Sequence, residues 1–410
     1  MRIIQENNQE PSNVYTLPPV VPREERGGSP RHRGRWILLV VLLVAALGGI
    51  GYYYRVPILN YLRGSSVIGE AVAMENDMAS QGKFVSIGEE RFFYCTRDGV
   101  RFFDGVGNQV WNQTFTMNSP AMVQAGELVA VAELQGRSAY VFSETGQKYA
   151  VQASGPILQL CLTKEGAMAL LEQNGDHFKI QVYSHAGQLL MERFEEDEGI
   201  YPLAVSLSAD GRVLAVSYLD TTGVQIKTRV LLFYTAMADS ANTETGDYYA
   251  GVEEDGVIAP VLYTMENGVF AAVTNGTVFG VSPEGSKAWS IPLGNEVTAV
   301  SSGGSYLAIA LGEEDPQKES LPEGTVLIFS DDGQQMASFD AGGAISYLKA
   351  NQFGLVVGSG RSFWGVRPQN GQVLWQYQAT EDVQDILLIQ TRKGLYVTGQ
   401  QAVLKVFEKQ

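Results

Sequence analysis

The sequence predicts an all-β fold, an eight-bladed β-propeller that follows one transmembrane helix and a disordered N-terminal tail. Two observations predict the propeller. A short glycine turn, seen most plainly at Val141–Tyr149, recurs at seven glycines with gaps of 39, 41, 59, 39, 48 and 38 along the chain. A proline also stands near the start of several of these units. A period of roughly 40 residues with several strand-like runs is typical of propeller blades.

Each copy of the turn reads as a β-hairpin. An apolar pair ends one strand, polar residues lead to the glycine, and a polar-then-apolar run opens the next strand. Glycine is expected there because a hairpin loop of three to five residues usually needs one residue at positive φ. The seven glycines are Gly107, Gly146, Gly187, Gly246, Gly285, Gly333 and Gly371.

The repeat divides residues 83–410 into blades. The expected bounds are 83–115, 116–153, 154–197, 198–255, 256–293, 294–341, 342–379 and a last unit from 380. The last unit is one strand short, so we expect residues 67–72 or 83–87 to complete the ring, because an unpaired sheet edge is exposed to other chains. We therefore expect eight blades, or seven if one unit with a weak repeat pattern does not form a blade of its own.

Pro120, Pro156, Pro202 and Pro260 mark the same phase. Each is expected just before the first strand of a blade, where a missing N–H is harmless.

Composition excludes a nucleic-acid surface. The formal charge of the 410 residues is −16, and residues 1–55 hold seven Arg and four Glu, so the rest of the chain carries 22 basic and 41 acidic residues. Phosphate binding needs clustered Lys and Arg that the chain lacks after Arg55.

The two cysteines, Cys95 and Cys161, fall in different blades and are expected to be separate buried thiols rather than a disulfide.

The chain before Lys83 reads as three segments. Residues 1–35 contain five prolines and few large apolar residues, which predicts a disordered tail. Residues 36–54 carry no charge and are long enough for a membrane helix, with Trp36 and Tyr52–Tyr54 at its two ends. Five arginines precede this helix closely, so its N-terminus is expected in the cytoplasm and the propeller outside it, at the cell membrane. Residues 55–82 form a connector. A cleaved signal peptide, with Val44–Ala46 as its cleavage site, is the alternative.

A resemblance supports the architecture. The run Asn370–Trp375, echoed by Gly107–Trp111 and Gly285–Trp289, resembles the end of the repeat in quinoprotein-like propellers, of the PQQ and WD40 type. That resemblance implies that the tryptophan packs between blades. The whole layout also looks like the uncharacterised, single-pass, membrane-anchored propellers of Gram-positive bacteria. It implies no activity, and neither cysteine has the adjacent partner that quinoprotein dehydrogenases carry.

Known catalytic motifs are absent from the sequence, which contains no G-x-S-x-G, no P-loop, no H-E-x-x-H and no C-x-x-C. Outside the tail, His177 and His185 are the only histidines, and both fall in predicted turns. We therefore expect a protein without catalytic activity, and neither a resident cofactor nor a metal beyond an optional Ca²⁺.

Acidic clusters are the one remaining pattern. They occupy equivalent links between blades, or the long insertion 312–324, all of which should emerge on one face of the propeller. The members are Glu195, Glu196, Asp197, Glu198, Glu253, Glu254, Asp255, Glu313, Glu314, Asp315, Glu381 and Asp382. The simpler interpretation is that these acids keep an exposed protein soluble. The sharper one is a face that binds a basic protein segment, a Lys-rich envelope component or Ca²⁺.

The sequence thus predicts a membrane-anchored, extracytoplasmic binding scaffold or sensor at the cell envelope, with protein or cell-wall partners. The alternative is an enzyme that acts on an envelope polymer or a small metabolite with carboxylates in the propeller channel. Glycoside hydrolysis needs two carboxylates at a defined separation, which one sequence does not reveal across blades.

Overall fold

The computed structural model describes Val41 and, in the propeller, residues 67–75, 82–87, 91–104, 108–235, 248–313, 320–352, 354–389, 394–398 and 402–408. Three predicted segments lie outside these residues: the tail 1–35, the transmembrane helix 36–54 apart from Val41, and most of the connector 55–82. Within the described ranges, no helix has the length and apolar character needed to cross a membrane.

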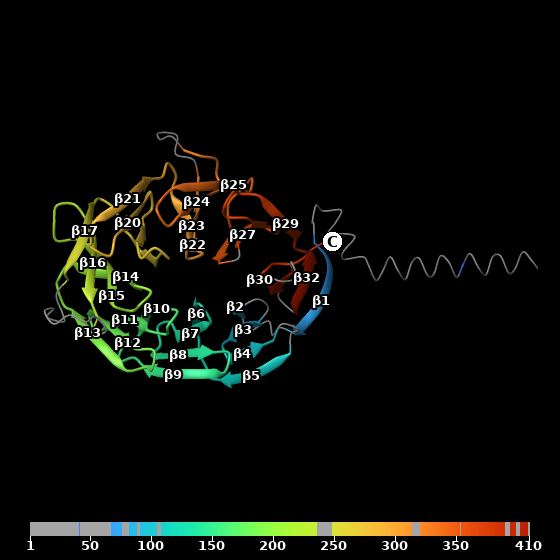
Figure 1. Ribbon diagram of the computed structural model, residues 1–410, viewed down its shortest axis with the longest axis horizontal. Coiled ribbons are helices and arrows are strands. Elements are labelled where there is room, and N and C mark those ends of the chain that lie inside the picture. Colours follow the sequence, from blue (N-terminus) through green and yellow to red (C-terminus); the bar gives the residue numbers. More distant parts are fainter. Residues whose placement is uncertain are drawn as a thin grey trace, which may run out of the picture. The chain divides into compact units, whose positions relative to one another are not determined.

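The described residues of the propeller form eight four-stranded sheets, and strands that are neighbours in a sheet pair antiparallel (Figure 1). We number the sheets as blades 1 to 8. Blades 1 to 4 are β2 Lys83–Ile87, β3 Arg91–Thr96, β4 Gly99–Phe103, β5 Gln109–Thr114; β6 Pro120–Ala125, β7 Leu128–Glu133, β8 Ser138–Ser143, β9 Gly146–Gln152; β10 Ile157–Leu162, β11 Met168–Asn174, β12 His177–Tyr183, β13 Leu189–Glu195; and β14 Ile200–Leu207, β15 Val213–Asp220, β16 Lys227–Tyr234, β17 Ala250–Asp255. Blades 5 to 8 are β18 Val261–Thr264, β19 Phe270–Val273, β20 Thr277–Val281, β21 Lys287–Pro292; β22 Val297–Ser302, β23 Tyr306–Leu311, β24 Thr325–Ser330, β25 Gln335–Asp340; β26 Tyr347–Asn351, β27 Gly354–Ser359, β28 Ser362–Val366, β29 Val373–Gln378; and β30 Asp385–Ile389, β31 Gly394–Thr398, β32 Ala402–Glu408 with β1 Val67–Glu75.

The all-β propeller is therefore confirmed, and the sheets follow the repeat of the sequence. Blades 1 to 7 each consist of four consecutive strands. Blade 8 is composite, because its outermost strand is β1, which pairs with β32 from Val67 opposite Glu408 to Glu75 opposite Ala402. Of the two segments expected to close the ring, residues 67–75 do so, and residues 83–87 form the innermost strand of blade 1.

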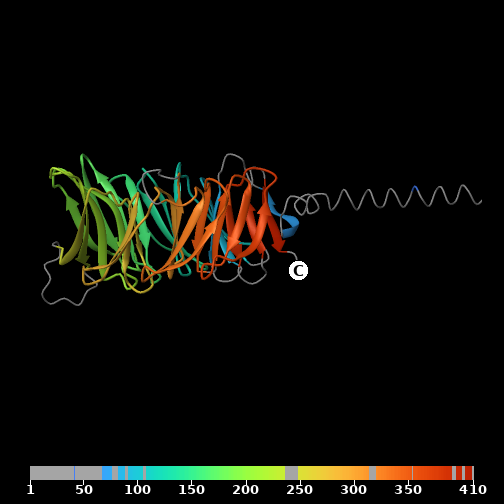
Figure 2. The ribbon, with the colours of Figure 1, turned by 90° about the horizontal axis from the view of Figure 1, so that it is seen from above.

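The connections between strands define two faces of the disc, which Figure 2 shows edge-on. We call one the hairpin face, because it carries the turns between the first and second strands and between the third and fourth strands of each blade. The other is the link face, which carries the turns between second and third strands and the links from one blade to the next. The assignment follows from the antiparallel order of the strands.

The apolar core lies between neighbouring blades. The second and third strands are buried on both sides, as in β7 and β23, whereas the outermost strand alternates, as in β17. Individual core clusters join two blades, for example blades 3 and 4 around Leu171, Val182 and Tyr218. Each blade is thus stabilised by burying both of its faces against its neighbours.

The glycine turns have the predicted conformation wherever the structure describes them. Gly146, Gly187, Gly285, Gly333 and Gly371 all have positive φ, between 70° and 119°; Gly107 and Gly246 lie outside the described residues.

A second constraint on these turns comes from the preceding blade. At Gly333 a Cβ atom would lie 2.6 Å from the ring of Trp289 in blade 5, and at Gly187 it would lie 2.8 Å from Tyr149 in blade 2. A side chain in the turn would therefore collide with the neighbouring blade.

The tryptophans pack between blades, as the resemblance implied. Trp111 of blade 1 donates a hydrogen bond to the carbonyl oxygen of Glu144 in blade 2 (2.7 Å), and Trp289 of blade 5 donates one to Asp331 of blade 6 (3.2 Å). Tyrosines do the same elsewhere: Tyr149 donates to the carbonyl of Gly166 in blade 3. Two kinds of aromatic residue thus fill one structural role.

One proline departs from the expected position. Pro120 begins β6, and Pro156 and Pro260 precede β10 and β18 directly, but Pro202 is the third residue of β14. The register of β14 shifts between Pro202 and Ala204. A proline is tolerated inside a strand at such an irregularity, because the ladder already lacks a hydrogen bond there.

Cys95 and Cys161 are free cysteines on β3 and β10, in blades 1 and 3, as the sequence predicted, but only Cys95 is buried and Cys161 is half-buried. Burial raises the pKa of the Cys95 thiol to about 12.

Candidate functional site

The predicted acidic residues that the structure describes fall on the link face, in two links, in one turn and at the ends of strands β13 and β17. Glu196, Asp197 and Glu198 lie in the link between blades 3 and 4, and all three are exposed. Glu313 is exposed in the turn between β23 and β24, and Glu381 and Asp382 lie in the link between blades 7 and 8. Glu314 and Asp315 lie outside the described residues.

Several of these acids have basic partners within the propeller. Glu195 accepts hydrogen bonds from the Nε of Arg193 (2.6 Å) and from the hydroxyl of Tyr218 in blade 4 (2.8 Å). Burial, and then the charge of Glu195, raises the pKa of Tyr218 well above its ordinary value. Glu195 therefore joins blades 3 and 4 instead of facing solvent.

The acids at the end of β17 are also paired. Glu253 contacts the Nζ of Lys227 (3.1 Å) and the Nε of Arg229 (3.0 Å), and Asp255 lies 3.9 Å from the same Lys227. The hydrogen bond and the charge of Glu253 raise the pKa of Lys227. Glu254 forms an ion pair with Lys287.

Asp382 contacts Arg361, at 3.0 Å. The link face is thus less negative than its count of acidic residues predicts.

A groove opens on the link face beside these acids. It spans blades 4, 5 and 6 and has a volume of about 420 Å³. Its lining is mainly apolar, with Ile226 and Ile258 on one side and Val297 and Val300 on the other. Ile226 and Ile258 keep 38% and 39% of their surface exposed, so part of this apolar lining is open to solvent.

The groove arises from a difference in strand length. The first strands of blades 4 and 5 are aligned at the hairpin face, where the hydroxyl of Thr264 donates to the carbonyl of Leu207 (2.7 Å). From that level β14 has eight residues and β18 has four. The difference is about 13 Å of strand at roughly 3.3 Å per residue. Three residues of the link that precedes the shorter blade, Gly256, Ile258 and Pro260, line the groove.

The rim of the groove is acidic. Asp255, whose side chain is 74% exposed, precedes the lining residue Gly256, and exposed Glu296 precedes the lining residue Val297. No ion pair joins Glu296 to a basic side chain among the described residues. Of the adjoining insertion, Leu321 is held at the rim, because the side-chain amide of Asn295 donates to its carbonyl oxygen (2.8 Å).

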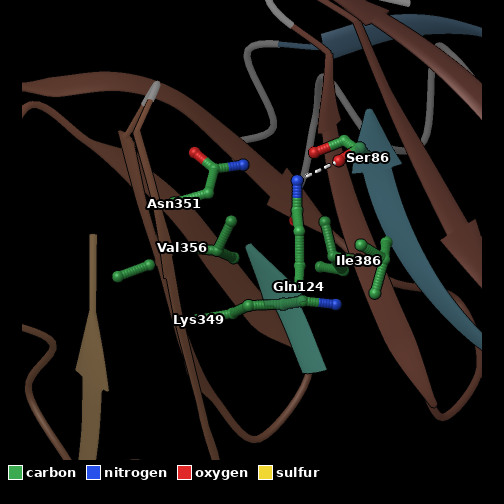
Figure 3. Close-up of a pocket in the computed structure, with 8 residues that line it drawn as sticks. Ser86, Gln124, Lys349, Asn351, Val356 and Ile386 are labelled. Carbon is green, nitrogen blue, oxygen red and sulfur yellow. Dashed lines mark hydrogen bonds between the residues drawn. The ribbon is translucent and has the colours of Figure 1, made fainter. Parts of the chain in front are cut away.

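A second, smaller pocket of about 40 Å³ lies between the first strands of blades 1, 2, 7 and 8 (Figure 3). Gln124 points across it and donates a hydrogen bond to the carbonyl oxygen of Ser86. Its volume admits water but no larger ligand.

Asp385 of blade 8 precedes the lining residue Ile386 and accepts hydrogen bonds from blades 1 and 7. Its Oδ2 accepts from the backbone N–H of Phe84 in blade 1 (2.7 Å), and its Oδ1 accepts from the hydroxyl of Tyr347 in blade 7 (2.6 Å). Lys349 contacts both oxygens, at 2.8 and 3.0 Å. The Asp385 side chain is 8% exposed. We call the junction of blade 8 with blades 7 and 1, where the ring closes, the seam. It is therefore stabilised by a buried carboxylate surrounded by hydrogen-bond donors.

Glu172 plays a similar part between blades 2 and 3. Its Oε2 accepts hydrogen bonds from the backbone N–H groups of Ser154 and Gly155, both at 3.0 Å, and lies 3.8 Å from the Nζ of Lys179. The sequence reasoning missed both Asp385 and Glu172. In each case the available signal was a single charged residue next to a run that is otherwise apolar.

The described residues include no group of three or more His, Cys, Asp or Glu that is placed to hold a metal ion. His177 is exposed at the start of β12, on the link face, and His185 is exposed in a turn of the hairpin face. The two histidines therefore belong to opposite faces.

Comparison with solved structures places the chain in the class of β-propellers. BamB from Moraxella catarrhalis is 12% identical with a TM-score of 0.50, over 83% of this chain and 98% of that one. Sqt1 from Saccharomyces cerevisiae is 13% identical with a TM-score of 0.54, over 82% and 98%. The C-terminal WD40 domain of Sif2 is 10% identical with a TM-score of 0.55, over 83% and 98%. At these identities the likeness shows the fold alone.

The chain belongs to a family of unknown function (DUF5711), whose model matches residues 66–406. The match begins next to β1 and ends within β32, so it covers the whole closed ring. No curated protein matches the chain.

Proposed function

We propose that this protein is a membrane-anchored binding scaffold that presents its propeller outside the cytoplasm and binds an envelope partner through the link face. The observation that carries the proposal is the groove of blades 4 to 6, a concave apolar surface with an acidic rim. Concave, mainly apolar surfaces with a few placed polar groups are the usual form of binding sites. Partners at an envelope include proteins and cell-wall components, and the open groove favours a protein segment.

The membrane anchor is proposed from the sequence. Residues 36–54 carry no charge, and Arg23, Arg26, Arg31, Arg33 and Arg35 all precede them closely. The excess of arginine on that side directs the N-terminus to the cytoplasm.

We propose binding rather than catalysis because the acids at the end of β17, beside the groove, are held in ion pairs. Glu253 is shared by Lys227 and Arg229, and Glu254 pairs with Lys287. A general acid or base has to reach the substrate with its carboxylate, and these carboxylates already contact basic side chains of the propeller.

The proposal is tested by photo-crosslinking in intact cells. A photoreactive residue at Ile258 or Glu196 samples the link face, and one at Leu189 or Glu284 samples the hairpin face as a matched control. The expected result is a crosslinked envelope partner from the link-face positions only. Crosslinking confined to the hairpin-face positions would refute the proposal.

The proposed topology is tested separately with protease added to cells from which the wall has been removed. Digestion of the chain after residue 55, with the tail protected, is the expected pattern. Digestion of the tail with a protected propeller would reverse the orientation.

A further inference from the structure

We propose that the groove of blades 4 to 6 binds an extended basic segment of a partner protein, with one aliphatic side chain of that segment inserted between Ile258 and Val297. This inference rests on the proposed function, since it specifies the partner chemistry at the same face. It goes further in naming an apolar anchor as the centre of recognition, with charge at the rim.

The shape of the groove favours an inserted side chain. Its volume of about 420 Å³ exceeds what one or two waters fill, and its lining includes Ile226, Ile258, Val297 and Val300. Val224, in the same turn as Ile226, is fully exposed, and Leu321 at the adjoining insertion is 42% exposed. Burying such surface is worth about 25 cal/mol per Å² removed from water. An aliphatic anchor would therefore gain contacts on both walls.

Two of the three polar side chains in the lining are already hydrogen-bonded within the fold, and the third is Asn275. The hydroxyl of Thr274 already donates to the carbonyl of Thr277 and accepts from its N–H, and the hydroxyl of Thr298 donates to the carbonyl of Ala310. A sugar or a small polar metabolite would need unpaired donors and acceptors in the groove. A side chain that needs none fits this lining better.

The acidic rim of the groove favours basic residues in the rest of the partner segment. On the blade 4 side, Asp220, Glu253 and Asp255 share only Lys227 and Arg229, which leaves one negative charge in excess. On the opposite side, Glu296 and Glu313 are exposed and form no ion pair with the described basic residues. Lysine or arginine residues on either side of the anchor would meet an acidic rim, and like charges would be repelled.

The test uses the full-length chain in detergent and a labelled peptide with a single leucine flanked by lysines. Fluorescence anisotropy is expected to show binding that weakens as salt rises. Two companion peptides separate the contributions: one replaces the leucine with serine, and one replaces the lysines with glutamate. Each change is expected to reduce affinity at least about tenfold, since a factor of ten corresponds to about 1.4 kcal/mol.

Variants of the protein then locate the site. Ile258→Asp and Glu296→Lys should each lower affinity for the leucine peptide about tenfold or more. Leu189→Asp and Glu284→Lys make the same chemical changes on the hairpin face and should leave affinity unchanged. Melting temperatures are measured in parallel, and Ile258→Ser replaces Ile258→Asp if the aspartate variant melts early.

Several results would overturn the inference. Three of them are equal binding of the leucine and serine peptides, equal binding of the lysine and glutamate peptides, and loss of affinity in the hairpin-face variants. If the link-face crosslinks identify a partner but the leucine peptide does not bind, the proposed function stands and this inference fails. If the partner residue crosslinked at Ile258 lies in a stretch without lysine or arginine, or belongs to this chain itself, the inference also fails.

Discussion

Replacement of Asp385 with asparagine tests whether the seam of the ring depends on a buried negative charge. Every group around the carboxylate is a donor: the N–H of Phe84, the hydroxyl of Tyr347, the N–H of Ile386 and the ammonium group of Lys349. Asparagine has the same shape, but its NH₂ group would face donors in either orientation. The change therefore removes the charge and leaves at least one donor opposed by another.

The expected cost follows from the surroundings of the pair. Removing one partner of a buried ion pair costs about 3–5 kcal/mol. The Lys349 side chain is 35% exposed, so water replaces part of the lost contact and we expect the lower end, about 3 kcal/mol. The entropy of unfolding is about 0.7 kcal/mol/K for the roughly 340 residues of the propeller, so the melting temperature should fall by about 4 °C.

The assay is thermal melting followed by circular dichroism, together with hydrogen exchange at the amide of Phe84, which should become faster in the variant. Asp382→Asn is the control. Its partner Arg361 and Asp382 itself are 55% and 68% exposed, so its loss should cost less than about 1 kcal/mol. If the melting temperatures of Asp385→Asn and Asp382→Asn are indistinguishable, the seam does not depend on this charge.

Two further predictions concern tyrosines and turn glycines. Burial raises the pKa of Tyr183 and of Tyr249 from 10.0 to about 12, so the folded state keeps protons that the unfolded state releases; stability should be full below pH 10 and fall as pH rises toward 12. Melting temperature and tyrosinate absorbance measured across this range check it, and an unchanged melting temperature up to pH 12 would contradict it. Gly333→Ala should destabilise the fold more than Gly146→Ala, because both have positive φ but only Gly333 faces a ring, that of Trp289 at 2.6 Å. Urea unfolding of the two variants measures the difference, and equal midpoints would show that Trp289 moves aside.

The periodic part of the fold could be predicted from the sequence because it repeats. The glycine turns set the phase of blades 1 to 7, and the observed strands begin within a few residues of the predicted bounds. The exception is informative: Pro202 lies inside β14, because an irregular register tolerates a proline that regular pairing would exclude. Closure by β1 was one of two options, since a pattern of alternating residues does not say which free segment pairs with the last strand.

The acidic residues show what a sequence pattern leaves open. Repeat phase placed Glu195 and Glu253 at equivalent positions, and both are indeed at the link-face ends of fourth strands. Glu195 is paired with Arg193 of the same strand and with Tyr218 of blade 4, whereas the basic partners of Glu253, Lys227 and Arg229, lie on another strand. The number of acidic residues in the sequence therefore overstates the negative charge of the link face, because an ion pair between strands joins residues that are not adjacent in the sequence.

The groove depends on irregularity in the repeat rather than on the repeat itself. Blade 4 has three strands of eight residues, whereas the first two strands of blade 5 have four each. Equal blades would leave a level rim, and this mismatch produces a step on the link face, since the hairpin ends of both blades are aligned by Thr264 and Leu207. Lengthening β18 and β19 equally should therefore fill the groove without altering the contacts that close the ring at Asp385, so binding and ring stability are separable properties of this propeller.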